Sequence, residues 1–310
     1  MTDIVLHHYE GSPFSEKAKL MLGFKDLEYH SCIIPGIMPK PDLTELTGGY
    51  RKTPVLQVGS HIYCDSERIA MALEEIRPEP TLYPADTGLA AKTTADWADH
   101  TFFQIMIGYS FQPRALSGFQ MDPDMAPKVA RDRVAMRQNS NVLKFPLEES
   151  ITRLNQLMER LEGHLAGHPF ALGETACIAD FSLYHNFWMM RRNSVLEKDF
   201  DHYPHIRGWM DRVAGFGYGR PVDISSGDAV KLAARTAPGT EPEDFTDPNG
   251  FRPGDEVQIR ATDYGRDPVA GILVRSGTEE IALRRHGERA GDLIVHFPRN
   301  HYEILRPESK

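Results

Sequence analysis

The stretch "HYEGSPFSEKAKLML", residues 8–22, joins a strand pattern to a helical pattern and decides how the first structural unit begins. The run "DIVLHHY" has the short apolar character of a strand, and Pro13 suits the first position of the helix that "AKLMLGF" continues. Two hydroxyl groups, on Ser12 and Ser15, lie at this junction. The oxygen of Ser12 can accept a backbone N–H and cap the helix. The same helix N-terminus can also hold an anion such as a thiolate or a carboxylate.

The composition predicts a folded protein of two or three domains. The chain has 310 residues, of which 41% are hydrophobic and 25% charged, and these values argue against disorder. No window approaches the ~18 consecutive apolar residues of a membrane helix, and the N-terminus lacks the pattern of a signal peptide. We therefore expect a cytoplasmic protein without a membrane partner.

Cysteine content and charge exclude further classes of function. Cys32, Cys64 and Cys177 show no metal-binding spacing, which predicts neither a disulfide framework nor a metal site. The formal net charge of −9 disfavours nucleic acid as a partner.

Three domains and a linker follow from the patterns along the chain. The segment "TPVLQVGSHIYCDSERIAMALEEIRP" reads as two strands and a helix that begins at Ser66, which completes a small α/β domain over residues 1–82. Strand signals vanish from 88–217, where apolar residues recur at helical spacing and predict an all-α domain. Residues 218–250 are rich in Gly, Pro, Asp and Thr and predict a linker with one possible short helix over "DAVKLAART". Five short alternating segments over 251–308 predict a small SH3-like β-barrel that folds as a separate unit.

The order of elements and several motifs resemble the glutathione transferase superfamily, in which a thioredoxin-like domain precedes an all-α domain. The motifs are "GSPFSEKAKL", "KTPVLQ" and "CDSERIA", followed by "LGETACIADFSLYHNFWMM" in the helical half. The resemblance covers residues 3–217 and implies glutathione as co-substrate, a small-molecule electrophile as the second substrate, and a homodimer.

The resemblance assigns roles to individual residues. Ser12 would stabilise the glutathione thiolate, with Tyr9 as the alternative and Ser15 as a third choice. The glutathione-binding residues that it implies are Phe14, Lys52, Thr53, Pro54, Asp65 and Ser66, with Pro54 in the cis form. From the residues alone, helix capping is the favoured interpretation of Ser12 and of the pair of Asp65 and Ser66, and Lys52 can equally be a solvated surface charge.

The segment "TADWADHTFFQIMIGYSFQPR" carries aromatic residues at mixed helical spacings, which usually indicates core packing. In the superfamily the corresponding helix also forms a wall of the electrophile pocket. Phe103, Tyr109 and Phe111 are therefore the residues that the resemblance proposes for that pocket.

Two functions of different classes are compatible with these observations. The first is a glutathione transferase-like enzyme that supplies glutathione thiolate to an apolar electrophile. The second is a non-catalytic scaffold of the same fold that uses the C-terminal barrel for protein interaction. Ser12, Thr53, Asp65 and Ser66 favour the enzyme, and the additional barrel favours the scaffold.

Overall fold

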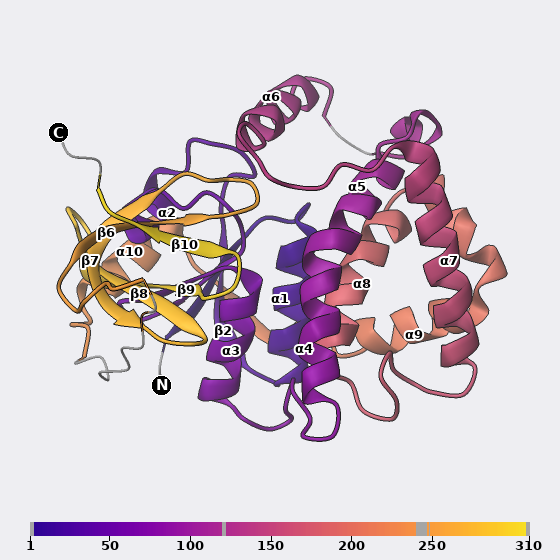
Figure 1. Cartoon of the computed structure of the whole chain (residues 1–310), viewed down its shortest axis with the longest axis horizontal. Helices are drawn as coiled ribbons and strands as arrows, with labels where there is room; N and C mark the ends of the chain where they lie inside the picture. Colours follow the sequence, from indigo (N-terminus) through magenta and orange to yellow (C-terminus); the bar gives the residue numbers. More distant parts are fainter. Residues whose placement is uncertain (1–2, 120–121, 240–246, 248, 308–310) are drawn as a thin grey trace.

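The structure, a computed structural model, describes residues 3–119, 122–239, 247 and 249–307. Residues 1–2 of the first predicted domain, residues 240–246 and 248 of the predicted linker, and residue 308 of the last predicted domain lie outside the described residues. The helical half of the molecule lies at one end and the last strands lie at the other, with the first domain between them (Figure 1). No helix among the described residues combines the length and the apolar character that crossing a bilayer requires.

The first domain is a sheet covered by helices, as the sequence predicts. Its elements are β1 (Ile4–His8), α1 (Pro13–Phe24), β2 (Glu28–Ile33), α2 (Pro41–Thr47), β3 (Val55–Val58), β4 (His61–Cys64) and α3 (Ser66–Ile76). β1 runs parallel to β2 and antiparallel to β3, and β3 and β4 form a hairpin. This order confirms the thioredoxin-like arrangement, and the peptide bond between Thr53 and Pro54 is cis, as the resemblance implies.

β1 is buried on both faces, which explains its continuous apolar run. Successive side chains of a strand point to opposite faces of the sheet. Ile4 and Leu6 accordingly join the core beneath α1 and the helical domain, whereas Val5 joins the core on the other face. The strand thus lies between two hydrophobic cores.

The described residues of the second part of the chain form helices joined by loops, which confirms the predicted all-α domain. It contains α4 (Gly88–Trp97), a π-helical segment (Ala98–Phe102), α5 (Phe103–Ser110), α6 (Ala126–Met136), α7 (Leu147–Leu165), α8 (Ile178–Arg191) and α9 (Pro204–Ala214), with 3₁₀ turns at Pro113–Gly118 and Leu196–His202. α8 packs against α1 and α4, so the helical domain is joined to the first domain through a shared core.

The segment predicted as a linker contains two elements of the fold. β5 (Arg220–Asp223) pairs in parallel with β2, and α10 (Ser226–Ala234) packs against α2. The helix matches the short helix expected from the sequence, whereas β5 was not expected. All four side chains of β5 are exposed, so it has none of the apolar alternation by which a strand is recognised.

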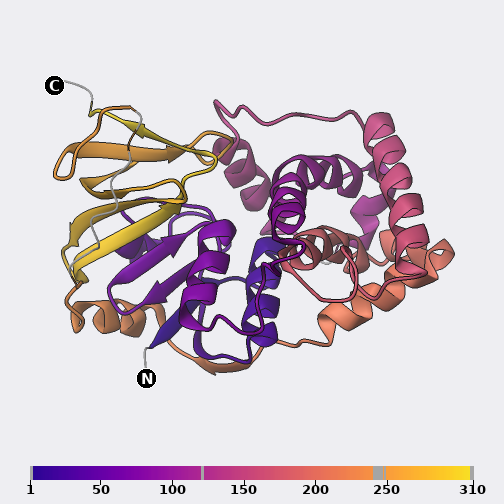
Figure 2. The same cartoon turned by 60° about the horizontal axis from the view of Figure 1, so that its bottom comes forward.

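The last five strands extend the sheet of the first domain. They are β6 (Glu256–Ala261), β7 (Val269–Ser276), β8 (Glu280–Gly287), β9 (Gly291–Pro298) and β10 (Tyr302–Leu305). β9 pairs in parallel with β4, which gives one sheet in the order β10-β6-β7-β8-β9-β4-β3-β1-β2-β5. Figure 2 shows the last strands, in orange and yellow, beside the first domain. Apolar side chains of both halves of this sheet share one core. Five strands were predicted here, but their continuity with β4 was not.

A buried ionic cluster joins α3 to β8 and β9. Arg68 of α3 lies with its guanidinium 3.1 Å from the Glu280 carboxylate, and His296 of β9 donates to the same carboxylate. Burial alone would raise the pKa of Glu280, but the hydrogen bond from His296 and the charge of Arg68 lower it to about 2. The last strands are therefore tied to α3 by charge as well as by backbone pairing.

Replacing Glu280→Gln should lower the free energy of unfolding by about 3 to 5 kcal/mol, because it leaves the buried Arg68 guanidinium with a weakened counter-charge. Glu75→Gln is the matched control, since Glu75 also contacts Arg68 but its side chain is 59% exposed; its cost should stay within about 1 kcal/mol. The stabilising effect of Glu280 should disappear as the pH falls from about 4.5 towards 2, since its native pKa is depressed. Urea denaturation measures both variants, and equal losses would contradict the prediction.

Candidate functional site

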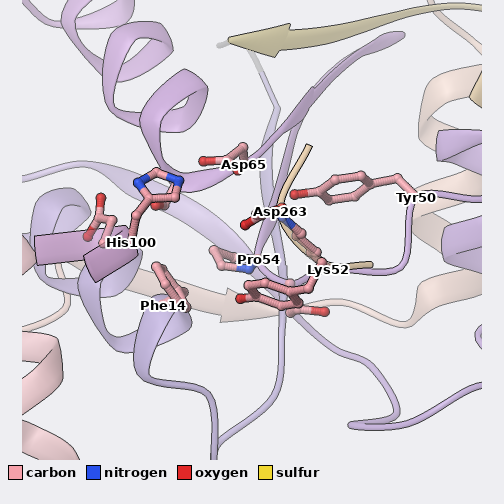
Figure 3. Close-up of a pocket in the computed structure, with 11 residues that line it drawn as sticks. Phe14, Tyr50, Lys52, Pro54, Asp65, His100 and Asp263 are labelled. Carbon is pink, nitrogen blue, oxygen red and sulfur yellow. The ribbon is translucent and has the colours of Figure 1, made fainter. Parts of the chain in front are cut away.

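A pocket lies where the first domain, the π-helical segment after α4 and the connection between β6 and β7 meet (Figure 3). Its lining consists of Phe14, Tyr50, Lys52, Thr53, Pro54, Asp65, Ser66, Asp99, His100, Asp263 and Tyr264. All six residues that the resemblance assigns to ligand binding are in this set. Sequence reasoning missed the other five. Two of them, Asp263 and Tyr264, fall at the end of the first short segment predicted as a strand, but β6 ends at Ala261 and they lie in the connection after it.

Asp65 and Ser66 form the end of the pocket at the N-terminus of α3. One oxygen of the Asp65 carboxylate accepts the backbone N–H of Glu67 at 3.0 Å, and the other accepts the Tyr302 hydroxyl at 2.9 Å. Asp65 has φ 78°, a conformation that costs non-glycine residues free energy and that its contacts hold in place. Ser66 accepts a hydrogen bond from the Lys17 ammonium at 3.3 Å.

The opposite end of the pocket carries Lys52 and Thr53. The Lys52 ammonium donates to Asp263 at 2.6 Å and lies 4.4 Å from the centre of the Tyr264 ring. The Thr53 hydroxyl accepts from the Lys40 ammonium at 2.8 Å. Burial and the nearby guanidinium of Arg133 lower the pKa of Lys40 to about 8.

A buried charge network connects the floor of the pocket to the helical domain. Lys17 of α1 donates to Asp99 at 2.5 Å, and His185 of α8 donates to the other Asp99 oxygen at 2.9 Å. Burial alone would raise the pKa of Asp99, but Lys17 and His185 outweigh it and hold that pKa well below its usual range. Asp99 therefore stays ionised and fixes the ammonium of Lys17 against Ser66.

The three hydroxyls proposed for catalysis lie beside the pocket and are not part of its lining. Ser12 is buried, and its oxygen accepts the N–H of Ser15 at 3.1 Å, which makes it the N-cap of α1. The Tyr9 hydroxyl accepts from Arg133 of α6 at 3.1 Å. The Ser15 oxygen is buried without a hydrogen-bond partner among the described residues. Phe14, between the two serines, does line the pocket.

The three aromatic residues proposed for an electrophile pocket do not form one wall. Phe103 packs with its ring centre 4.9 Å from that of Phe14. Tyr109 instead donates to Asp199 at 2.6 Å, and Phe111 is 58% exposed. Six residues turn an α-helix by about 240°, so positions 103 and 109 face different directions. Only Phe103 contacts the pocket lining through a ring contact.

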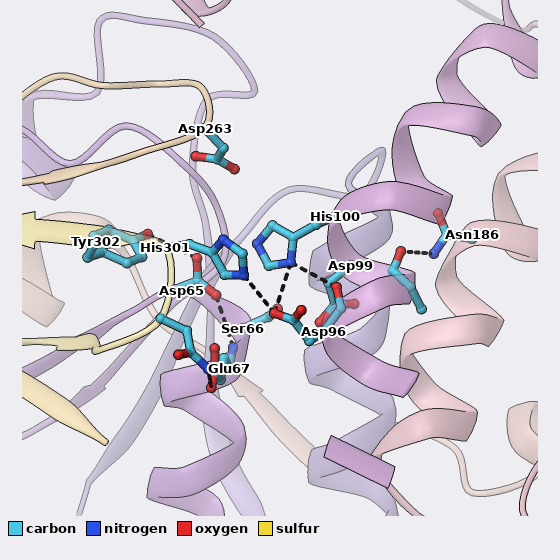
Figure 4. Close-up of polar contacts among 12 residues, drawn as sticks. Asp65, Ser66, Glu67, Asp96, Asp99, His100, Asn186, Asp263, His301 and Tyr302 are labelled. Atoms are coloured by element: carbon cyan, nitrogen blue, oxygen red, sulfur yellow. Dashed lines mark hydrogen bonds and ion pairs between the residues drawn. The ribbon is translucent and has the colours of Figure 1, made fainter. Parts of the chain in front are cut away.

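An acidic and histidine-rich cluster borders the pocket on the side of α3 and α4 (Figure 4). His301, from the turn between β9 and β10, donates to Asp96 at 2.6 Å, and its ring stacks on that of His100 with the centres 3.6 Å apart. The hydrogen bond to Asp96 raises the pKa of His301. Asp96, His100 and His301 place possible metal ligands within 4.8 Å of one another, but the close contact between Asp96 and His301 is that of an ion pair.

Comparison with known proteins places two parts of the chain in one family. Residues 6–81 match the family described as "Glutathione S-transferase, N-terminal domain", and residues 145–212 match "Glutathione S-transferase, C-terminal domain". The probable maleylacetoacetate isomerase 1 of Drosophila melanogaster is 26% identical in an alignment of 214 residues that covers 54% of this chain and 82% of that protein.

Solved structures extend the similarity to the whole chain. A GST-like protein from Pseudomonas syringae is 40% identical, with a TM-score of 0.83 and with 99% of this chain and 100% of that chain covered. A glutathione S-transferase from Rhodospirillum rubrum, 17% identical with a TM-score of 0.51, covers 68% of this chain and 87% of its own, and shows the fold alone. The similarity to the Pseudomonas syringae protein thus includes the last strands.

Glu67, the second residue of α3, lies close to Asp65, and the ionisation of its carboxyl group should make the stability of the protein depend on pH. Burial and the carboxylate of Asp65 raise the pKa of Glu67 to about 7. Because the native pKa is raised, the free energy of unfolding of the wild type falls as the pH rises from about 4.5 to 7. Above pH 7 the carboxyl is ionised in the folded state and the loss of stability is complete. Glu67→Gln should therefore be more stable than the wild type at pH 8, by up to about 3 kcal/mol, and equal to it at pH 4.

Urea denaturation at both pH values measures this difference. Glu75→Gln, an exposed position on the same helix, is the control and should show no such pH dependence. If the free energy of unfolding of the two variants changed equally between pH 4 and pH 8, ionisation of Glu67 would not destabilise the folded protein and the prediction would be wrong.

Proposed function

This chain belongs to the glutathione S-transferase family, and from this premise we propose that it binds glutathione in the pocket of Figure 3 and activates its thiol for attack on a small apolar electrophile. Members of the family use glutathione as a co-substrate. The observation that carries the proposal is the gathering of Phe14, Lys52, Thr53, Asp65 and Ser66 in one pocket.

The two ends of the pocket offer groups that match the γ-glutamyl end of glutathione and its peptide backbone. The Asp65 carboxylate can accept from the α-ammonium, and the start of α3 with the Ser66 hydroxyl can receive the α-carboxylate. The backbone of Thr53 can pair with the cysteinyl residue. This orientation directs the thiol towards Phe14 and the start of α1.

Ser12 is the residue that we propose to stabilise the thiolate. Its oxygen accepts the N–H of Ser15, so the hydroxyl proton remains available for donation to sulfur. A free thiol with a pKa near 8.5 is only a few per cent ionised at pH 7, and lowering that pKa by about two units makes the thiolate the major species. The positive end of the α1 dipole favours the same ionisation.

The scaffold function predicts binding without turnover, and the assays below separate it from the enzyme. The homodimer implied by the resemblance stays a prediction. β4 has no free edge, because β3 and β9 pair with its two sides. Any dimer must therefore use another surface.

Asp65→Asn should weaken glutathione binding by about tenfold or more, because it removes a charged acceptor from the α-ammonium. Asparagine keeps the ability to cap α3 and to adopt positive φ, so the change isolates the charge. Isothermal titration calorimetry measures the affinity. An unchanged dissociation constant would exclude Asp65 from the binding site.

Ser12→Ala should raise the pKa of the enzyme-bound glutathione thiol and slow turnover of a generic electrophile by about 100- to 1,000-fold. Titration of the thiolate absorbance in the ultraviolet gives that pKa directly. Tyr9→Phe should change both quantities little. The opposite pattern would move thiolate stabilisation to Tyr9, and no turnover by the wild type would support the scaffold function.

A further inference from the structure

If the backbone of Thr53 pairs with the cysteinyl residue, the glycyl carboxylate of glutathione would approach the ammonium of the neighbouring Lys52. The last strands alter this end of the pocket. The Lys52 ammonium already donates to Asp263 at 2.6 Å and lies over the ring of Tyr264. Both charged side chains are largely buried, with 11% of Lys52 and 15% of Asp263 exposed. The positive charge of Lys52 is therefore already neutralised by Asp263 in the protein without a ligand.

The turn that carries Asp263 is held in place by backbone hydrogen bonds on both sides. The carbonyl of Asp263 accepts the N–H of Asn141 at 2.9 Å, and the N–H of Gly265 donates to the carbonyl of Met136 at 2.8 Å. The N–H of Thr262 donates to the carbonyl of His301 at 2.9 Å. The backbone around Asp263 is therefore fixed, and its side chain is a permanent part of the pocket lining.

A glycyl carboxylate would meet two unfavourable choices at this wall. If it took Lys52 from Asp263, the aspartate would be left partly buried without its counter-charge. If Asp263 kept Lys52, two carboxylates would lie side by side, which raises the free energy of the complex. Asp99, which also lines the pocket, is already paired with Lys17, so Asp263 is the carboxylate that the glycyl end would meet.

An amide at the glycyl end would meet neither difficulty. Its carbonyl can accept from Lys52 while its N–H donates to Asp263, and both bonds form without breaking the ion pair. Glutathione carries two carboxylates and one ammonium at neutral pH, and masking the glycyl carboxylate removes the charge that Asp263 repels. The γ-glutamyl end would keep its contacts with Asp65 and Ser66.

We propose that Asp263 makes this site selective for a glutathione derivative whose glycyl carboxyl is an amide, as in a conjugate with an amine, over free glutathione. The proposal rests on the proposed function, because it assumes that the pocket binds the γ-glutamyl-cysteinyl part of glutathione. Asp263 is then a specificity-determining residue supplied by the C-terminal strands.

Calorimetric titration of the full-length protein with glutathione and with glutathione amide tests the proposal. The two probes differ only at the glycyl carboxyl, which is a charged carboxylate in one and a neutral amide with N–H donors in the other. The wild type should bind the amide about tenfold more tightly. Asp263→Asn removes the negative charge and releases Lys52 for a carboxylate, so the preference should fall to parity or reverse.

Asp267→Asn is the matched control. It makes the same change of charge in the same turn, but Asp267 is 49% exposed and lies 3.8 Å from Arg51 rather than beside Lys52. It should keep the tenfold preference. The comparison of the two probes on the wild type needs no variant, so it remains decisive even if Asp263→Asn fails to fold.

Equal or tighter binding of free glutathione by the wild type would overturn the selectivity and leave the proposed function intact. The same preference in the wild type and in a folded Asp263→Asn would overturn the role of Asp263. Failure of the wild type to bind either probe would overturn the proposed function and this inference with it.

Discussion

Backbone pairing between β4 and β9 is the interaction on which the rest of this structure depends. It attaches the C-terminal strands to the sheet of the first domain and places the turns after β6 and β9 beside the start of α3. Asp263, Tyr264, His301 and Tyr302 reach the pocket region because of this attachment. A β-domain tethered only by a flexible linker would not hold a carboxylate within hydrogen-bonding distance of Lys52.

Buried charges reinforce both junctions of the first domain. Arg68 and Glu280 link α3 to β8, and Lys17 and Asp99 link α1 to the helical domain. Such pairs add less stability than apolar packing of the same volume, because both charges must leave water. They require a more exact geometry than apolar contacts, however, and removing one partner leaves a buried charge without compensation. They therefore favour one relative placement of the three parts, and the pocket lies where that placement brings them together.

The pocket has one side formed by the thioredoxin-like domain, which is common to the family, and another formed by the C-terminal strands. Lys52, Thr53, Asp65 and Ser66 come from the thioredoxin-like domain, and their arrangement supports a ligand with an ammonium, two amide groups and a thiol. Asp263 and Tyr264 line the same pocket and, in our proposal, determine what the far end of that ligand can be. Under this proposal, chemistry at the sulfur and selectivity at the glycyl end depend on different parts of the chain, so that either could change with little effect on the other.

The sequence by itself determined the local structure: the strand-to-helix junction capped by Ser12, the start of α3 at Asp65 and Ser66, and the helical character of residues 88–217. These features depend on neighbours a few residues apart, whose spacing and capping chemistry are visible in the sequence. Only the tertiary structure decided that Lys52 pairs with Asp263, 211 positions away, and that Tyr109 turns towards Asp199. Periodicity records which face of an element is apolar, but the partner of a strand edge or of a charge is set by packing between distant segments, and no local pattern encodes it.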